Sequence, residues 1–153
     1  MTAHIKMSPI EFIAKLRPGA DQCESEKGIP ASFTIAQAAL ESSWGGSALS
    51  TVAANLFGVK ADKSWKGKTL SMNTREYLHN EWLTVPAVWR VYADWAECLL
   101  DHAEFFKVNP RYAKALQFAH DGKLFARAIS LAGYATDPLY GDKLISIINK
   151  HSL

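Results

Sequence analysis

The chain has 153 residues, of which 48% are hydrophobic and 21% charged, a balance that suits one folded domain and excludes an intrinsically disordered protein. The formal net charge of +2 is too small to indicate nucleic-acid binding, and the two cysteines make neither a disulfide framework nor a zinc site. No run approaches the roughly 18 apolar residues of a membrane-spanning helix, so we expect no membrane insertion.

The first predicted helix begins after Ser8, because Ser8-Pro9-Ile10-Glu11 has the pattern of a capping box with proline in the first helical turn. We expect Pro18-Gly19 to interrupt or kink this helix, and a polar continuation to end at Gly28. Residues 1–12 show no continuous apolar core and no small-residue cleavage site. They therefore predict a protein that is made in the cytoplasm without a secretory signal.

The second predicted helix begins at Pro30 and stops at Gly45-Gly46, and its apolar residues recur at helical spacing. Glu41 lies near its end, between Leu40 and Trp44. A carboxyl group beside an apolar, partly closed surface can stay protonated near neutral pH, which makes Glu41 a candidate general acid. From the periodicity alone, however, a glutamate at such a position is more often an ordinary solvated residue on the helix surface than a general acid.

The composition of the sequence changes between residues 55 and 92. Glycines and a proline separate short segments of strand-forming residues there, which predicts a small β lobe or an irregular excursion. We expect strands at residues 56–60 and 88–92. Glu76 lies in this lobe beside Arg75, whose charge favours an ionised carboxylate, so Glu76 is a candidate second carboxylate of a glycosidase. Its rivals are Glu81, Asp94 and Asp137.

Helices are predicted again in the rest of the chain. Asp94 caps a helix that runs to about Phe106, Asn109-Pro110 starts another, Asp121-Gly122 leads into a third, and residues 139–148 form the last. No internal repeat, low-complexity run or linker divides the sequence. We therefore predict a single α+β domain over residues 1–153 that is predominantly α, with a groove between the helices and the β lobe.

Six elements of the sequence, in order, resemble those of glycoside hydrolase family 73. They are Ala36-Gln-Ala-Ala-Leu-Glu-Ser-Ser-Trp-Gly45, Asn55-Leu-Phe-Gly-Val-Lys60, Thr74-Arg-Glu-Tyr77, Trp89-Arg-Val-Tyr92, Asn109-Pro-Arg-Tyr112 and Gly133-Tyr-Ala-Thr-Asp-Pro-Leu-Tyr140. The departures from the family pattern, Ser43, Trp89 and Gly141, remove no chemical group from it.

The resemblance implies a lysozyme-like fold and a catalytic role for Glu41 as general acid. It places Glu76 at the second acidic position and Tyr134 at a tyrosine that holds substrate or water near the acid. The candidate substrate-binding residues within these elements are Gln37, Trp44, Asn55, Phe57 and Asp137.

Members of this family are bacterial and phage enzymes that cut peptidoglycan glycan strands, usually as N-acetylglucosaminidases. The resemblance implies the same substrate here, with no metal, no cofactor and a monomeric enzyme. A stand-alone hydrolase of this kind resembles a phage endolysin, which is made in the bacterial host cytoplasm and acts on the cell wall after release. The alternatives are an N-acetylmuramidase, a lytic transglycosylase and a catalytically silent peptidoglycan-binding module.

Overall fold

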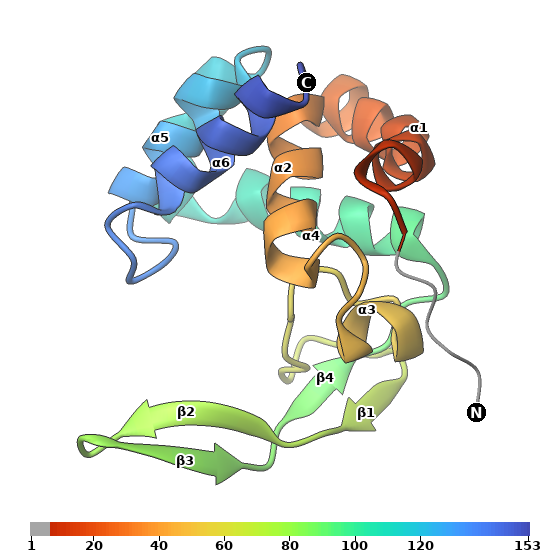
Figure 1. Cartoon of the computed structure of the whole chain (residues 1–153), viewed down its shortest axis with the longest axis vertical. Helices are drawn as coiled ribbons and strands as arrows, with labels where there is room; N and C mark the ends of the chain where they lie inside the picture. The colour runs from red at the N-terminus through yellow and green to blue at the C-terminus, as the bar shows by residue number, and fades with distance from the viewer. Residues whose placement is uncertain (1–6) are drawn as a thin grey trace.

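A computed structural model describes residues 7–153 of the chain and shows a helical lobe above a smaller β lobe (Figure 1). The lysozyme-like α+β class that the sequence predicted is confirmed. The helices are α1 (Pro9–Lys27), α2 (Ala31–Ser42), α3 (Ala48–Val52), α4 (Trp95–Val108), α5 (Gly122–Leu131) and α6 (Tyr140–Lys150), with 3-10 turns at η1 (Pro110–Tyr112) and η2 (Ala115–Phe118). None of the helices among residues 7–153 is both long and apolar enough to cross a membrane.

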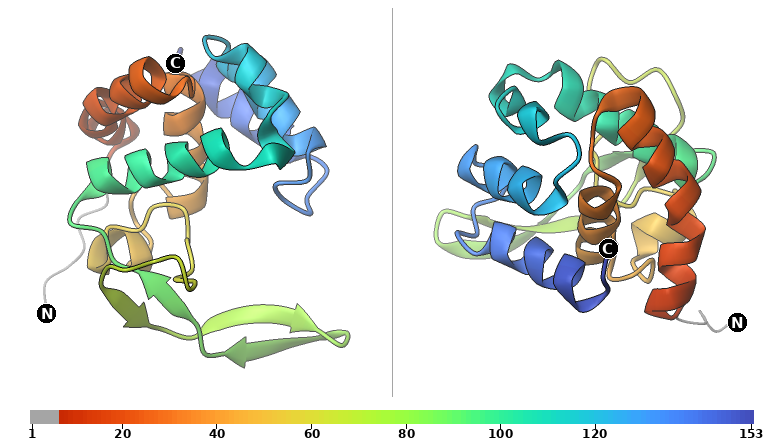
Figure 2. Two further views of the ribbon diagram at one scale, coloured as in Figure 1. Left: turned by 180° about the vertical axis from the view of Figure 1, so that it is seen from behind. Right: turned by 90° about the horizontal axis from the view of Figure 1, so that it is seen from above.

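Helix α2 runs through the middle of the helical lobe and contacts α1, α5 and α6 (Figures 1 and 2). Its sequence is rich in alanine, and Ala36, Ala38 and Ala39 are fully buried. Small side chains let neighbouring helices pack close to α2 on all sides, so its sides are buried along most of its length. The C-terminal end of α2 points toward the β lobe, as Figure 1 and the left view of Figure 2 show.

Helix α1 begins and ends where the sequence predicted, but Pro18 does not interrupt it. Ser8 caps its first turn, accepting a hydrogen bond from the backbone N–H of Glu11, and Gly28 ends it in the left-handed conformation at φ 73°. Pro18 and Ala14 lie on the exposed side of α1, so the Ala14 carbonyl that loses its helical donor faces water. Burial of apolar side chains before and after Pro18 keeps the helix continuous.

The β lobe consists of two separate two-stranded antiparallel sheets. Strand β1 (Thr69–Ser71) pairs with β4 (Val88–Arg90), and β2 (Thr74–Leu78) pairs with β3 (Glu81–Val85) to form a hairpin that projects from the lobe (Figure 1). The strand predicted at residues 56–60 is wrong. Lys60 alone forms a bridge, to Trp89, because the backbone around residue 58 turns through a left-handed glycine.

The other differences from the predicted elements are small. Helix α2 ends two residues before Trp44, and α4 continues two residues past Phe106. The helix expected at Asn109-Pro110 is only the short turn η1. Helix α3 was not predicted.

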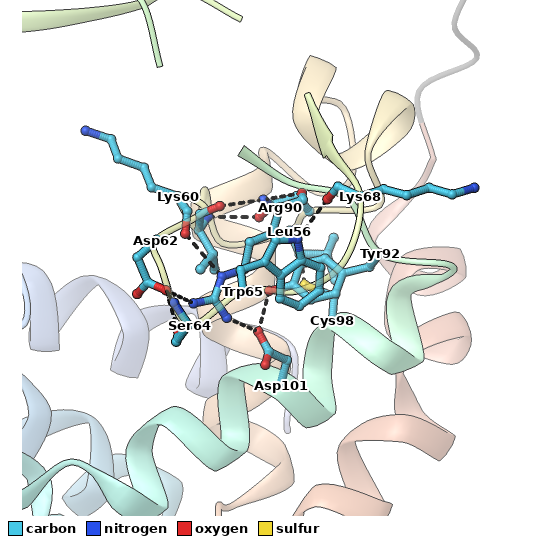
Figure 3. Close-up of polar contacts among 12 residues, drawn as sticks. Leu56, Lys60, Asp62, Ser64, Trp65, Lys68, Arg90, Tyr92, Cys98 and Asp101 are labelled. Atoms are coloured by element: carbon cyan, nitrogen blue, oxygen red, sulfur yellow. Dashed lines mark hydrogen bonds and ion pairs between the residues drawn. The ribbon is translucent and has the colours of Figure 1, made fainter. Parts of the chain in front are cut away.

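Arg90 at the end of β4 ties the β lobe to the helical lobe (Figure 3). Its guanidinium donates to Asp101 on α4 at 2.9 Å and to Asp62 at 3.4 Å, and it lies 5.0 Å from the centre of the Trp65 ring. Its Nε donates to the carbonyl of Lys60 at 3.1 Å. These contacts fix the loop of residues 55–68 in place, and this loop borders the site described next.

Candidate active site

Glu41 reaches the surface because α2 ends abruptly just beyond it. Ser43, Trp44 and Gly45 all have positive φ, at 52°, 56° and 79°, and this left-handed run turns the chain away from the helix axis. The Ser42 hydroxyl supports the turn by accepting from the backbone N–H of Gly45 at 2.9 Å. Glu41 therefore lies in the last turn of a buried helix, with its side chain open to solvent.

The Glu41 side chain lines a hollow of about 200 Å³ at the junction of the lobes. The other lining residues are Ser47, Ala48, Leu49, Asn55, Leu56, Gly58 and Met72, none of which carries a charge. Although the side chain is accessible, the protein around its carboxyl group removes much of the water, and this desolvation raises the pKa of Glu41. A hydrogen bond from Tyr140 acts in the opposite direction but is the smaller effect.

A line of hydrogen bonds leads from Glu41 into the core. The Tyr140 hydroxyl donates to Oε1 of Glu41 at 2.7 Å, and Nε2 of Gln37 donates to the Tyr140 oxygen at 2.9 Å. The Gln37 oxygen lies 2.9 Å from Nε2 of His102. Gln37 is fully buried, and Tyr140 and His102 are 5% and 7% exposed, so this polar line is closed to water except at Glu41.

A second hollow of about 230 Å³ adjoins the first, and both are lined by Gly58. Phe57 and Tyr134 contribute aromatic walls, and Lys60 lies at its margin. The Tyr134 ring stacks on Tyr140 with centroids 5.5 Å apart, and its pKa is raised by burial and by the charge of Glu41. The predicted residues Glu41, Phe57 and Tyr134 therefore lie in one continuous region.

The structure places Glu76 outside both hollows. It lies on β2, where Oε1 accepts from Nζ of Lys60 at 2.8 Å. Both side chains are partly exposed, so this ion pair contributes no more than about 1 kcal/mol to stability and can open readily. Lys60 connects Glu76 to the margin of the second hollow, but the structure does not bring Glu76 together with Glu41.

Two of the residues predicted to bind substrate, Gln37 and Asn55, are held by hydrogen bonds within the protein. The Gln37 amide is fully buried and bonded within the protein, so it has no surface to offer a ligand. Asn55 is 1% exposed, and its amide bonds the backbone of Val59 in both directions and the carbonyl of Arg90. Asn55 therefore shapes the loop that lines the hollow.

Trp44 and Asp137 are also engaged elsewhere. The Trp44 ring packs edge-on against Phe12 and against His151 near the C-terminus, on neither hollow beside Glu41. Asp137 accepts from the backbone N–H of Leu139 at the start of α6 and pairs with Lys143. The substrate contacts predicted for these two side chains are not supported by their positions.

Tyr140 and His102 are residues of this site that were not predicted from the sequence. Tyr140 ends the sixth family-like element, so its place in that motif was the available signal. His102 gave no sequence signal, because a lone histidine on a predicted helix is indistinguishable from an ordinary core residue.

Three further features lie apart from this chemistry. A hollow of about 660 Å³ is lined by residues of α1, α3 and the start of α4, including Lys15 and Trp95, but not by Glu41 or Glu76. Within residues 7–153, no group of three or more histidine, cysteine, aspartate or glutamate side chains could hold a metal ion. Cys23 and Cys98 are buried free thiols, and burial raises the pKa of Cys23 to about 11 and of Cys98 to about 12.

Comparison with known proteins gives consistent matches over almost the whole chain. Residues 17–153 match the family described as "Glucosaminidase: Mannosyl-glycoprotein endo-beta-N-acetylglucosaminidase". The chain is 40% identical over 139 residues to "Peptidoglycan hydrolase FlgJ" of Vibrio cholerae, covering 89% of this chain and 42% of that protein. It is 38% identical over 146 residues to "Exo-glucosaminidase LytG" of Bacillus subtilis, covering 93% of this chain and 51% of that protein.

A solved structure gives the same result for the fold. The C-terminally truncated glycoside hydrolase domain of FlgJ from Salmonella typhimurium superimposes with a TM-score of 0.81 at 40% identity, covering 95% of this chain and 98% of that one. The chain thus spans about half the length of the full-length relatives it matches, and nearly all of this solved domain.

Proposed function

The chain belongs to the glucosaminidase family, glycoside hydrolase family 73, and from this premise we propose that it cleaves β-1,4 glycosidic bonds of bacterial peptidoglycan. The observation that carries the proposal is Glu41, a carboxyl group with a raised pKa that opens into a hollow between two lobes. The names of the relatives, a peptidoglycan hydrolase and an exo-glucosaminidase, support the substrate and the sugar. We propose endo-β-N-acetylglucosaminidase as the specific activity.

In the proposed mechanism Glu41 is the general acid. Its Oε2 carries the proton and transfers it to the glycosidic oxygen as the bond to the sugar breaks. The Tyr140 hydroxyl, already bonded to Oε1 at 2.7 Å, stabilises the carboxylate that remains. The environment of Glu41 thus favours the protonated acid before the step and still provides a donor for the carboxylate after it.

The second role falls to Glu76 in this proposal. As a carboxylate it would activate water or stabilise the positive charge that develops on the sugar. It would first exchange its Lys60 partner for water or substrate, and exposed ion pairs do this at little cost. Tyr134, stacked beside the acid, is the candidate for holding substrate or water.

Mass spectrometry of digested muropeptides tests the proposal, with the Glu41→Gln variant as a matched inactive control. New reducing N-acetylglucosamine ends are expected from the wild type and none from the variant. Reducing muramic acid ends would assign a muramidase, and anhydro-muramic ends a lytic transglycosylase. Binding to cell walls with no release of fragments would assign a silent binding module and refute hydrolysis.

At the level of the whole protein, we propose a monomeric, bacteriolytic phage endolysin that is made in a bacterial host cytoplasm and acts on the wall after release. This proposal rests on the resemblance of the sequence to phage endolysins of this family, and a lysis assay in bacterial cells tests it. Expression together with a separately encoded membrane pore is expected to cause lysis, whereas expression alone leaves cells intact. Lysis without any pore would contradict this mode of release.

A further inference from the structure

The hydrogen-bonded line behind Glu41 has a defined direction. His102 lies in the core with its ring stacked 3.8 Å from Phe57 and edge-on to Phe106, and burial lowers its pKa to about 3. The imidazole is therefore neutral at neutral pH, where it carries a single N–H. Desolvation, rather than a neighbouring charge, is the cause of this shift.

The orientation of the Gln37 amide sets the direction of each hydrogen bond along the line. The amide nitrogen of Gln37 donates to the Tyr140 oxygen, so the amide oxygen of Gln37 faces His102 and can only accept. With the amide in this orientation, the imidazole carries its hydrogen on Nε2. Since the Tyr140 oxygen already accepts from Gln37, its single O–H is directed to Oε1 of Glu41.

We propose that His102 is a positioning residue for the general acid, which acts through Gln37 and Tyr140 to keep the acidic proton of Glu41 on Oε2. Oε1 always accepts from Tyr140, so the proton occupies the oxygen left free for the substrate. Without the His102 donor, the Gln37 amide can turn its oxygen toward Tyr140. The Tyr140 hydroxyl then bonds Gln37 and leaves Glu41. This inference deepens the proposed function, because it rests on Glu41 as the acid.

Other titratable groups of residues 7–153 lie near the two ends of this line. Among residues 7–153, Tyr134 in the α5–α6 loop and Tyr140 on α6 interact electrostatically with Glu41. The charged residues lining the hollow that His102 borders are Lys60, Asp62, Arg90 and Asp101. Of these, Asp62 and Asp101 are bonded to Arg90, which leaves the hydrogen-bonded line as the direct polar route from His102 to Glu41.

A merely structural role for His102 predicts a different outcome. If the side chain only satisfies a buried polar group, its loss lowers the free energy of unfolding and leaves the titration of Glu41 unchanged. If it acts through the line, its loss removes a donor from the ionised form of Glu41, and the pKa of Glu41 rises. The two roles therefore differ in a measurable quantity.

The experiment is NMR on the full chain with isotope-labelled glutamate and histidine. Nitrogen shifts of His102 report which ring nitrogen is protonated, and the carboxyl carbon shift of Glu41 reports its titration. The variants are His102→Phe, which keeps an aromatic ring beside Phe57, and His102→Gln, which returns an amide N–H of similar reach. His120→Phe makes the same change at an exposed histidine and is the matched control.

The expected wild-type result is a neutral His102 protonated on Nε2 across the pH range of activity. We expect the titration of Glu41 to move up by about half a pH unit or more in His102→Phe and to return toward the wild-type value in His102→Gln. The titration in His120→Phe should not move. In the pH profile of kcat/KM on soluble glycan fragments, the alkaline limb should move to higher pH in His102→Phe and return toward the wild-type position in His102→Gln.

A wild-type His102 protonated on Nδ1 would overturn the proposal, and this result needs no variant to fold. An unmoved Glu41 titration in a folded His102→Phe protein would overturn it as well. The carboxyl shift is measured without substrate, so the two proposals can fail separately. If only the proposed glycosidase activity is wrong, the titration of Glu41 still moves in His102→Phe, but the protein releases no sugar.

Discussion

The change Tyr140→Phe tests most directly how the protein sets the acidity of Glu41. It removes one oxygen that donates to Oε1 of Glu41 at 2.7 Å and accepts from Gln37 at 2.9 Å, and leaves the ring that stacks on Tyr134. Desolvation raises the pKa of Glu41 and the Tyr140 hydrogen bond lowers it. Without that bond only the raising effect remains, so the pKa must increase further.

The size of the increase follows from the strength of one hydrogen bond to a carboxylate. Such a bond contributes about 1.5–3 kcal/mol, and about 1.4 kcal/mol corresponds to one pKa unit. Because Glu41 is open to solvent, water replaces part of the lost bond, and we expect a shift toward the lower end, about one unit. The buried Gln37 amide also loses its acceptor, at a cost of about 1–3 kcal/mol in the free energy of unfolding.

The assay is the pH dependence of kcat/KM on soluble glycan fragments, with urea unfolding measured in parallel. A general acid must be protonated, so activity falls as pH rises through its pKa, and a higher pKa moves this alkaline limb to higher pH. Phe12→Leu, a change within the apolar core away from both hollows, controls for lost stability alone. An alkaline limb that stays in place or moves to lower pH in Tyr140→Phe would refute the reasoning.

Four further changes have defined outcomes. Glu41→Gln should abolish hydrolysis yet raise Tm near neutral pH, because ionisation of this desolvated carboxyl group opposes folding there. The increase in Tm should disappear as pH falls below the ordinary pKa of glutamate, about 4.3, where the wild-type carboxyl group is protonated in both states. His102→Gln should reduce the fall in the free energy of unfolding that occurs as pH drops from about 6.5, the ordinary pKa of histidine, to about 3. In the wild type, His102 binds a proton in this pH range when the protein is unfolded but not when it is folded. Glu76→Gln should slow glycan cleavage while changing the free energy of unfolding by less than about 1 kcal/mol; wild-type rates would remove Glu76 from the mechanism. Gly45→Ala should lower the free energy of unfolding by about 1–3 kcal/mol in urea, because φ is 79° and the new Cβ would lie 2.8 Å from the Trp95 ring.

The sequence predicted the helical lobe well because helix signals are local. Ser8 and Gly28 mark the ends of α1 through hydrogen bonds and backbone angles that those residue types favour by themselves. The interruption expected at Pro18 did not occur, because whether a proline breaks a helix depends on what the two halves bury and on which side faces water. Helix α3 was missed although Ser47 caps it, since five residues are too few to show a periodic pattern.

The site was harder to predict, because its geometry is set by tertiary contacts. Glu41 could be found from its helix end and the family-like motif, but the same motif placed Gln37 among the substrate contacts. Its neighbours from α4 and α6, His102 and Tyr140, turn that amide inward, and no spacing in the sequence reveals this. The role of Asn55 in shaping the loop could not be predicted for the same reason, since its bonds to Val59 and Arg90 join residues up to 35 positions apart.

The abrupt end of α2 has an electrostatic consequence for the residue it presents. The peptide dipoles of a helix sum to a partial negative charge at its C-terminus, and Glu41 lies in the last turn. The backbone therefore disfavours the anion of Glu41, by about 0.3–1 kcal/mol for an accessible group. This contribution comes from the helix itself, so side-chain substitution around the hollow cannot remove it. Extending α2 past Ser43, by contrast, would carry the negative pole away from Glu41 and make it a stronger acid.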